Sequence, residues 1–297
     1  MDNNLLKILN KLKSKFYFDY NIGKLTWFRT GGKAKIFILV ENSEELEIIL
    51  NEIKDENYYV LGSGSNLLIR DSGFNGIVLK LGKGFNIFNI FENKLEVGAS
   101  ILDINLSNFA LKNNFEGFEF LSGIPGSIGG AIKMNAGCFG SETKDILDSV
   151  EIYTSNFEKK IIKRKDINLE YRSSNIQNDQ IITKAKFDIK FGNSINIKEK
   201  MEYIKEKRLL SQPIKYKTSG STFKNPPNLF AAKLIEESGC KGLTFGDAVV
   251  SQKHANFLIN KGNATASDLE NLGKIIIEKV YKKFNVKLNW EVKIIGE

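Results

Sequence analysis

Two clusters of small residues constrain the fold of this chain more than any other feature. The first, Gly62-Ser63-Gly64-Ser65-Asn66, directly follows the apolar run Tyr58–Leu61, and the second extends from Gly123 to Ala131 with glycine or serine at five positions. Such residues let backbone N–H groups approach an anion closely. The first cluster has neither the Gly-x-Gly-x-x-Gly spacing nor the P-loop spacing. We therefore predict two loops that bind the two halves of a dinucleotide cofactor, with ordinary tight turns as the alternative.

Composition favours a folded protein over a disordered one. The 297 residues are 42% hydrophobic, which is ample for two or three compact lobes. The formal net charge of +8 is compatible with nucleic-acid binding, with an anionic membrane surface or with a site for phosphorylated substrates. The lysines are spread among acidic residues and form no basic helix or aromatic-basic stripe, so we expect no nucleic-acid partner.

Cysteine content and hydropathy bear on where the protein works. No window approaches the roughly 18 to 20 apolar residues of a membrane span, and the start of the chain lacks a signal-peptide pattern. The two cysteines, Cys138 and Cys240, cannot build a disulfide framework. No Cys/His/Asp/Glu cluster has the spacing of metal ligands. We expect a cytoplasmic protein without a membrane partner and without a metal site.

Hydrophobic periodicity predicts an α+β fold. Residues 2–16 have helical spacing behind Asp2 as a possible N-cap, and Asn42–Glu45 resembles a capping box before a second helix. The pattern changes near Gly192 and Asn193, where we place the domain boundary. Further helices are expected over 102–110, 197–210, 229–238 and 267–284, the last with a capping box from Ser267 to Glu270, and strands over 35–40, 58–61, 67–70, 77–81, 149–153, 160–164, 181–191, 255–259 and 286–295, with a strand-rich stretch over 87–97.

Several motifs, taken in order, resemble the UDP-N-acetylenolpyruvoylglucosamine reductase family over nearly the whole chain. The first half is similar at Thr30-Gly31-Gly32 and at the two glycine clusters. The second half is similar at Tyr171-Arg172, Gln212-Pro213, Gly220 to Pro226, Lys253 to Phe257, and Leu288 to Gly296 around Glu291. The Gly-Ser-x-Phe-Lys-Asn-Pro element is specific to this family, whereas the glycine loops also occur in other flavoenzymes.

The resemblance implies an architecture. It implies an FAD-binding domain of the vanillyl-alcohol oxidase (PCMH) type, in two lobes, over residues 1–193, with the division near residue 75. A smaller α+β substrate-binding domain follows over residues 194–297, and its last strand, about 286–297, is expected to pack back toward the first lobe. The segment between Arg172 and Ser221 is short and lacks a capping insertion, so the chain resembles the type II form. We expect a monomer.

The resemblance also implies a reaction. In the family, NADPH reduces FAD, and the flavin N5 delivers hydride to the enolpyruvyl group of UDP-N-acetylglucosamine enolpyruvate, which yields UDP-N-acetylmuramate for peptidoglycan. Ser221 matches the family's proton donor, and a carbanion is basic enough to accept a proton from a hydroxyl group. Arg172 and Glu291 match residues that stabilise the developing enolate. Glu291 could do so only if it is protonated or hydrogen-bonded. Without the resemblance, Arg172 and Glu291 would be interpreted as surface residues.

The remaining expected site residues divide between cofactor and substrate. By resemblance, FAD contacts Thr30, Gly31, Gly62, Ser63, Gly64, Ser65, Asn66, Leu67, Pro125, Gly126, Ser127, Gly129, Gly130, Asn135, Ala136 and Gly137. The UDP-sugar contacts Tyr171, Arg208, Gln212, Lys224, Asn225 and His254. His254 fits a buried structural histidine equally well. It is the single histidine of the chain, and nothing around it suggests a Ser-His-Asp triad.

Two other functions remain open. Another flavin oxidase or dehydrogenase of the same fold would act on an alcohol or a lactone, although a single histidine in the substrate-like half argues against covalent flavin attachment. A nucleotide-binding or nucleic-acid-binding protein without catalysis would lack flavin absorbance. Its affinity would fall steeply with salt.

Overall fold

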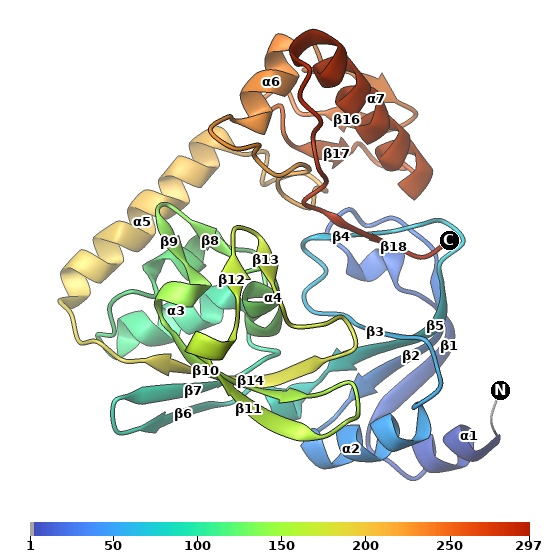
Figure 1. Cartoon of the computed structure of the whole chain (residues 1–297), viewed down its shortest axis with the longest axis vertical. Helices are drawn as coiled ribbons and strands as arrows, with labels where there is room; N and C mark the ends of the chain where they lie inside the picture. Colours follow the sequence, from blue (N-terminus) through green and yellow to red (C-terminus); the bar gives the residue numbers. More distant parts are fainter. Residues whose placement is uncertain (1–2) are drawn as a thin grey trace. The chain divides into compact units, whose positions relative to one another are not determined.

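The computed structural model describes residues 3–297, and the chain divides into two compact units (Figure 1). Unit 1 comprises residues 3–18, Lys35–Ser63 and Gly76–Glu206. Unit 2 comprises Asp19–Ala34, Gly64–Asn75 and Lys207–Glu297. Helices and strands are present in both units, which agrees with the expected α+β class.

Two β-sheets form the frame of unit 1. The four-stranded sheet has the order β1-β2-β5-β3, with β3 parallel to β5, and the five-stranded sheet has the order β11-β10-β14-β7-β6 with antiparallel neighbours. The strands are β1 (Lys15–Asn21), β2 (Lys33–Val40), β3 (Tyr58–Val60), β5 (Phe74–Leu81), β6 (Phe88–Phe91), β7 (Lys94–Gly98), β10 (Leu147–Tyr153), β11 (Lys159–Lys163) and β14 (Ile181–Asp188). Two short hairpins pair β8 (Gly137–Cys138) with β9 (Ser141–Glu142) and β12 (Leu169–Glu170) with β13 (Ser173–Ser174).

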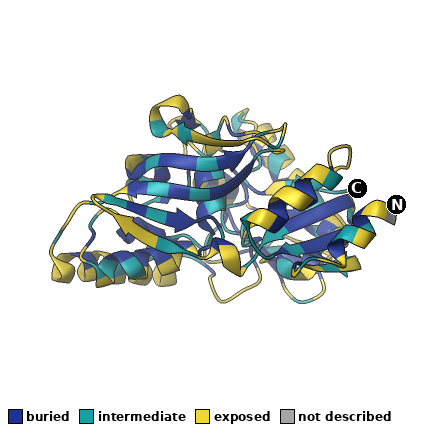
Figure 2. Cartoon of the chain, turned by 90° about the horizontal axis from the view of Figure 1, so that it is seen from below, coloured by how far each residue is buried: buried dark blue, intermediate teal, exposed yellow. Residues whose placement is uncertain are grey.

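Each sheet of unit 1 has its own hydrophobic core. Leu106 of α3 and Ile128 and Ile132 of α4 pack with the five-stranded sheet, while α1 and α2 supply apolar side chains to a second core with the four-stranded sheet. In Figure 2 many strand residues are buried: the inner strands β2, β7, β10 and β14 are mostly buried, whereas the edge strands β1, β6 and β11 are mostly exposed. The helices are α1 (Asn3–Leu9), α2 (Ser43–Glu52), α3 (Asp103–Lys112), α4 (Ile128–Lys133) and α5 (Ser194–Ser211), with 3-10 turns at Lys83–Phe85, Glu119–Gly123, Thr143–Asp145 and Arg164–Asp166.

Unit 2 is built around one core that draws on distant parts of the chain. Phe28 and Leu68, from early in the sequence, are buried with Phe223, Leu234 and Leu272. The last strand, β18, pairs in parallel with β4, so that Lys293–Ile295 lies beside Leu67–Ile69. The elements are β4 (Leu67–Ile69), α6 (Ala231–Glu237), β15 (Thr244–Phe245), β16 (Ala248–Val250), β17 (Leu258–Asn260), α7 (Ala266–Phe284), β18 (Lys293–Ile295) and a 3-10 turn at Gly23–Leu25, and β15, β16 and β17 form one antiparallel sheet.

The first helix is shorter than its periodicity predicts, because the chain turns into a strand. α1 ends at Leu9, and β1 begins at Lys15. The carboxylate of Glu45 accepts hydrogen bonds from the backbone N–H of Lys13 (2.9 Å) and of Ser14 (2.8 Å), which holds the turn. The predicted capping box of α2 is therefore only half formed. Asn42 caps Glu45, but the Glu45 side chain reaches to another segment. The predicted cap Asp2 lies outside the described residues.

Three local predictions in unit 2 are also wrong in detail. The capping box of α7 joins Thr265 to Asp268, whereas Ser267 to Glu270 was expected, because Glu270 pairs with Arg70. The predicted strand over 255–259 begins only at Leu258, since His254 to Phe257 forms a turn. The predicted strand over 286–295 is reduced to Lys293–Ile295.

The observed units differ from the predicted division after residue 193. α5 continues without interruption across the point where unit 1 passes into unit 2, between Glu206 and Lys207. Two early segments, Asp19–Ala34 and Gly64–Asn75, belong to unit 2 because Phe28 and Leu68 are buried in its core. A change of sequence pattern marks one boundary along the chain. It does not reveal that early segments belong to the later unit.

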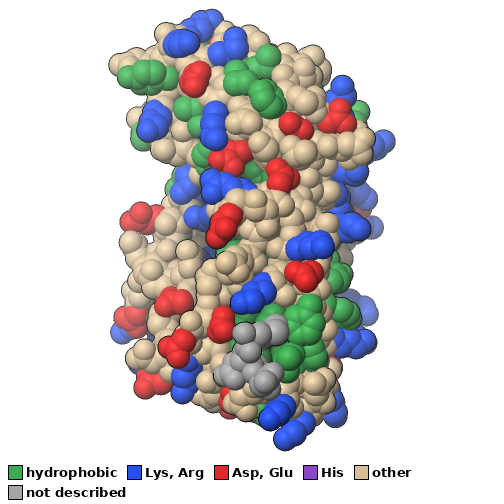
Figure 3. All heavy atoms as spheres, turned by 90° about the vertical axis from the view of Figure 1, so that its right-hand side faces the viewer, with side chains coloured by type: hydrophobic (Ala, Val, Ile, Leu, Met, Phe, Trp, Pro, Cys, Tyr) green, Lys and Arg blue, Asp and Glu red, His purple; other side chains and the backbone are tan. Residues whose placement is uncertain are grey.

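Charge is mixed on the surface. On the face shown in Figure 3, lysine and arginine side chains alternate with aspartate and glutamate side chains. Among the described residues, no helix is both long and apolar enough to cross a membrane. The same part of the chain contains no cluster of three or more potential metal-ligating side chains.

Candidate active site

The first two residues of the first glycine cluster, Gly62 and Ser63, lie against the second cluster in unit 1. The hydroxyl of Ser63 donates to the carbonyl oxygen of Pro125 over 3.5 Å. A Cβ atom built on Gly62 would lie 2.8 Å from Oγ of Ser127, so a larger residue would push the loops apart. The start of the first cluster is thus adjacent to the second cluster in the fold.

The second cluster is held along the start of α3. The N–H of Asp103 donates to the carbonyl of Gly126 (3.1 Å), and the N–H of Ile128 donates to the carbonyl of Ile101 (2.9 Å). A Cβ on Gly126 would lie only 2.3 Å from Oδ2 of Asp103. Glycine at this position therefore allows the loop to lie directly on the Asp103 side chain.

Asp103 is a buried acid that sequence reasoning missed. It is 0% exposed, and neither carboxyl oxygen has a hydrogen-bond partner of good geometry among the described residues. Burial raises the pKa of Asp103 well above its ordinary value, and the nearby Gly126 amide only partly opposes this. Burial therefore favours the protonated, uncharged form of the Asp103 side chain. The only sequence signal was an acid in the first turn of a predicted helix.

Lys80 is a second missed residue. Its Nζ donates to the carbonyl oxygen of Gly62 over 2.5 Å, at the start of the first cluster. Burial lowers the pKa of Lys80 from its ordinary value. A cation is thereby placed beside the glycine loops. The signal was a lysine interrupting the apolar run Ile77–Leu81, which we had interpreted only as a strand.

Asn135 organises the remaining site residues of unit 1. It is 0% exposed, and its Nδ2 donates to Glu142 (3.0 Å) and to the carbonyl of Glu170 (3.0 Å). Its Oδ1 accepts from the N–H of Lys144 (3.0 Å). The side chain expected to contact the cofactor is therefore engaged by the protein, and it connects the β8–β9 hairpin with the strand that precedes Tyr171.

Arg172 is placed by a constrained backbone. Its φ of 53° lies in the left-handed region, which is uncommon for a residue other than glycine. Its guanidinium donates to the carbonyl of Gly137 (2.8 Å) and lies 5.0 Å from the ring centroid of Tyr171. Ala136 and Gly137, which follow Asn135, are thus brought beside Tyr171 and Arg172.

The first cluster continues into unit 2 after Ser63. The N–H of Trp27 donates to the carbonyl of Gly64 (3.0 Å), and Gly64 has a φ of 70°. Gly31 has a φ of 117°, and a Cβ there would lie 2.3 Å from the carbonyl oxygen of Ile69. The hydroxyl of Thr30 donates to the carbonyl of Ala264 (2.6 Å). Thr30 and Gly31 therefore pack next to the segment that follows Ser65.

A chain of hydrogen bonds in unit 2 joins Asn66, Glu291 and the residue after Ser221. Nδ2 of Asn66 donates to the carbonyl of Glu291 (3.1 Å), and the N–H of Glu291 donates to the carbonyl of Thr222 (2.8 Å). Ser221 is half-buried, and within the described part of the chain its hydroxyl has no hydrogen-bond partner. The hydroxyl is therefore available to a bound molecule.

The expected substrate residues of unit 2 make hydrogen bonds within the protein. Oδ1 of Asn225 accepts from the N–H of Ala231 (3.0 Å) at the start of α6. Nε of Arg208 donates to Oε1 of Gln212 (3.1 Å), the residue directly after the end of α5. The backbone N–H of Lys224 donates to the carbonyl of Asn289 (2.8 Å).

His254 is neutral at neutral pH. Its Nδ1 accepts from the N–H of Asn256 (3.3 Å), so the proton is assigned to Nε2. Burial, reinforced by Lys241, lowers the pKa of His254, while Glu236 opposes the shift. The ring packs edge-on against Phe257 at 4.7 Å. His254 therefore stabilises the turn through its Nδ1, and its Nε2–H can donate a hydrogen bond to a ligand.

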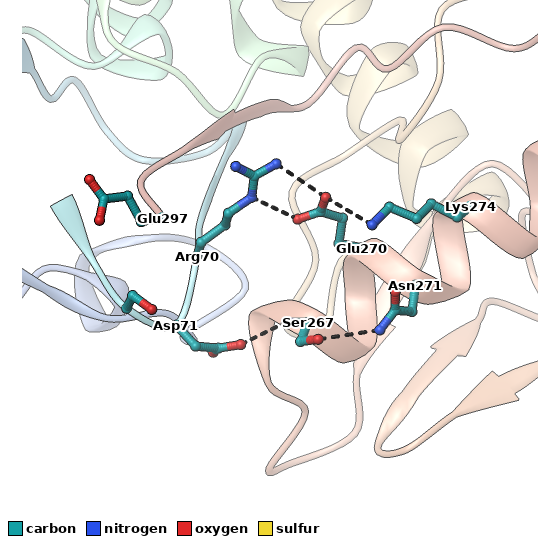
Figure 4. Close-up of a pocket in the computed structure, with 8 residues that line it drawn as sticks. Arg70, Asp71, Ser267, Glu270, Asn271, Lys274 and Glu297 are labelled. Carbon is teal, nitrogen blue, oxygen red and sulfur yellow. Dashed lines mark hydrogen bonds and ion pairs between the residues drawn. The ribbon is translucent and has the colours of Figure 1, made fainter.

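A separate polar cavity in unit 2 contains none of the expected site residues. Its volume is about 270 Å³, and Figure 4 shows that Arg70 and Lys274 both point toward Glu270. Nearby, Asp71 accepts the backbone N–H groups of Ala266 (2.9 Å) and Ser267 (2.8 Å) at the start of α7. The Arg70–Glu270 ion pair and the hydrogen bonds of Asp71 fasten the Gly64–Asn75 segment to α7.

The glycine loops fit FAD. Gly62 and Gly126 stand where an added Cβ would come within 3 Å of a neighbouring side chain, so only glycine leaves this space open. Backbone donors, the Lys80 cation and the hydroxyl of Ser127 are groups that suit a pyrophosphate and a polar ring. Pro125, Gly129 and Gly130 lie on the same segment, and Leu67 begins β4 directly after Asn66.

Comparison with known proteins agrees with this fit. Residues 34–156 match a family model described as FAD binding domain, and residues 212–295 match one described as UDP-N-acetylenolpyruvoylglucosamine reductase, C-terminal domain. The fold and the loops therefore define an FAD-dependent oxidoreductase of the PCMH type, as the motifs predict.

Relatives of known name narrow the class to one family. The UDP-N-acetylenolpyruvoylglucosamine reductase of Rickettsia typhi is 44% identical over 98% of this chain and 99% of that protein, and that of Rickettsia prowazekii is 43% identical over the same shares. The crystal structure of the enzyme from Thermus caldophilus has a TM-score of 0.83 and 32% identity, covering 96% of this chain and 99% of that one. The chain belongs to the UDP-N-acetylenolpyruvoylglucosamine reductase family.

Proposed function

We propose that this chain catalyses the reduction of UDP-N-acetylglucosamine enolpyruvate to UDP-N-acetylmuramate, with NADPH as reductant. The named relatives and the family-specific element around Ser221 support the proposal. When bound, FAD supplies the hydride equivalent, taken from NADPH, that adds to the enolpyruvyl double bond. Both the nucleotide sugar and NADPH are cytoplasmic metabolites, and we propose that the protein works there as a monomer of the type II form.

Ser221 is the proposed proton donor. The observation that carries this assignment is a half-buried hydroxyl, without a partner among the described residues, held directly before the buried residue Thr222. A carbanion beside the substrate carboxylate is basic enough to take a proton from a hydroxyl group. Because no base among the described residues is hydrogen-bonded to Ser221, the group is suited to donate a proton and not to act as a nucleophile.

Arg172 and Glu291 are proposed to stabilise the negative charge that develops in the substrate. The guanidinium of Arg172 can pair with a carboxylate through two N–H groups. The backbone of Glu291 is fixed by Thr222 and by Asn66, which holds its side chain in the same hydrogen-bonded segment as Ser221. Tyr171, Arg208, Gln212, Lys224, Asn225 and His254 are proposed to bind the UDP-sugar.

Cofactor contacts are proposed at the two loops and at the Thr30-Gly31 segment. Backbone groups of Gly62 to Leu67 and of Pro125 to Gly130 would bind FAD, while Asn135 shapes the site through its contacts to Glu142 and Glu170. Domain roles follow the same division. We propose that unit 1 carries most of the FAD site and that unit 2 carries most of the substrate site.

Anaerobic half-reactions test the proposal. Flavin absorbance should bleach when NADPH is added and return when UDP-N-acetylglucosamine enolpyruvate follows. Ser221→Ala should still bind FAD and bleach with NADPH, but its flavin absorbance should return at least about a hundredfold more slowly, within the range for loss of a general acid. Bleaching without recovery in the unmodified protein would indicate a different flavoenzyme. Normal recovery in Ser221→Ala would remove Ser221 as the proton donor.

A further inference from the structure

We propose that Asn256 is a positioning residue that fixes the orientation of Ser221 by holding the backbone immediately after it. The inference rests on the proposed role of Ser221. Asn256 is 4% exposed, and its carboxamide pairs with both polar groups of one residue, Phe223. The N–H of Phe223 donates to Oδ1 (3.0 Å), and Nδ2 donates to the carbonyl of Phe223 (2.8 Å). An amide side chain offers one acceptor and one donor side by side without needing to be protonated.

Thr222, between Ser221 and Phe223, is also held by the segment that contains Asn256. The N–H of Thr222 donates to the backbone carbonyl of Asn256 (2.8 Å), and Oγ1 of Thr222 accepts from the N–H of Leu258 (3.2 Å). From the other side, the carbonyl of Thr222 accepts from Glu291, as described above. Asn256 is thus the residue at which the turn before β17 is joined to the Ser221 segment by three hydrogen bonds.

Ser221 depends on the restraints at Thr222 and Phe223 because, in the described part of the chain, neither the preceding residue nor its own hydroxyl supplies one. The preceding residue, Gly220, has a φ of 78°, and no atom lies within 4 Å of a Cβ built there. A glycine in open space gives the chain wide conformational freedom on that side. The Ser221 hydroxyl also lacks a partner among the described residues. Its direction therefore follows from the fixed geometry of Thr222 and Phe223.

Precise placement matters for proton donation. A displacement of a reacting group by about 1 Å can cost on the order of a hundredfold in rate. Asn256→Ala and Asn256→Asp should therefore slow the return of flavin absorbance by about ten- to a hundredfold. They should leave the rate of bleaching by NADPH unchanged, since that step does not use Ser221. Asn256→Asp is the sharper variant because it keeps the size and the acceptor but loses the donor to Phe223.

Asn260 provides a matched control. It is 3% exposed, lies in the same unit, and holds backbone groups in the same manner, donating to the carbonyl of Phe28 (2.8 Å) and accepting from the N–H of Gly262 (2.9 Å). Asn260→Ala should lower thermal stability much as Asn256→Ala does. With FAD at saturation, it should leave the flavin recovery rate at the level of the unmodified protein. Equal slowing in both variants would reduce Asn256 to a stabilising residue and overturn the inference.

The decisive measurement is the double variant of Ser221→Ala with Asn256→Ala, in anaerobic rapid mixing. If Asn256 acts through Ser221, the double variant recovers no more slowly than Ser221→Ala alone, and the solvent deuterium isotope effect on recovery differs between Asn256→Ala and the unmodified protein. Two outcomes would refute the positioning role of Asn256 and leave the role of Ser221 intact. In the first, the losses in rate of the two single variants multiply in the double variant. In the second, Asn256→Ala recovers normally while Ser221→Ala recovers slowly.

A failure of the proposed function has a different pattern. If Ser221→Ala recovers normally, the proton-donor assignment and the inference fall together. If the unmodified protein never recovers with this substrate, hydrogen exchange decides. If Asn256 holds this segment, the backbone N–H of Phe223 exchanges with solvent faster in Asn256→Ala than in the unmodified protein, and at an unchanged rate in Asn260→Ala. An unchanged exchange rate in Asn256→Ala overturns the positioning role.

Discussion

The backbone N–H of Glu291 donates to the carbonyl of Thr222 over 2.8 Å, and this one hydrogen bond joins the last segment of the chain to the residue after Ser221. Beside it, Phe223 and Trp290 form an isolated antiparallel bridge. Two residues that sequence motifs assign to catalysis, about seventy positions apart, are therefore held in one unit by backbone contacts. Changes to the packing of this crossing should affect both.

Gly126→Ala should weaken FAD binding. The new Cβ would lie 2.3 Å from Oδ2 of a buried Asp103, so the loop must move. We expect a loss of FAD affinity of at least about tenfold, which corresponds to about 1.4 kcal/mol. Flavin fluorescence titration measures it. Gly262→Ala is the control, because no atom lies within 4 Å of the added Cβ. Unchanged affinity in Gly126→Ala would show that the loop does not contact FAD as proposed.

Lys80→Met should also weaken FAD binding, because it removes the cation that holds the Gly62 carbonyl. The expected loss is about tenfold, in the range of one hydrogen bond to a charged group. Titration at low and high salt should give a smaller salt dependence in the variant. Lys184→Met is the matched control, since Lys184 lies on β14 of the same unit and pairs with Glu96. Equal affinities in the two variants would contradict a role for Lys80.

The stability of the Asp103→Asn variant relative to the unmodified protein should increase as the pH rises. The folded-state pKa of Asp103 is raised, so above about pH 4 the unfolded state ionises while the folded state stays protonated. This difference lowers the stability of the unmodified protein as pH increases, until the folded pKa is reached. Asparagine cannot ionise, so the variant avoids that loss. Each kcal/mol recovered corresponds to about 2–4 °C in Tm for a chain of this size.

Thermal melts at pH 4 and pH 8 check the Asp103 prediction. The Tm difference between Asp103→Asn and the unmodified protein should be more positive at pH 8 than at pH 4. A difference that does not change with pH would mean that Asp103 is ionised in the folded protein.

Glu270→Gln should destabilise the protein near neutral pH and have little effect in acid. The pKa of Glu270 is lowered, chiefly by its hydrogen bonds with Arg70. Its stabilising contribution is therefore present above the unfolded pKa of about 4.5 and is lost as the pH falls. Because Arg70 is half exposed, the expected loss at pH 7 is only about 0.5–1 kcal/mol. Denaturant unfolding at pH 7 and pH 3.5 measures it, with Glu278→Gln on the same helix as control.

Sequence patterns alone determined the class of fold, the family, and the motifs. Most helices and strands begin within a few residues of their predicted bounds, because periodic apolar residues and local caps act over one or two turns. The glycine clusters indicated a cofactor loop, since small residues at those positions have a local steric meaning.

Tertiary structure decided the rest. The carboxylate of Glu45 accepts hydrogen bonds from the backbone N–H groups of Lys13 and Ser14 and does not complete the capping box of its own helix. Glu270 pairs with Arg70, two hundred positions away. Lys80, Asp103 and Asn256 acquire their roles only from what lies beside them: a carbonyl, a glycine and a backbone segment. Side-chain burial and hydrogen-bond partners depend on contacts between distant segments, and local propensity contains no record of those contacts.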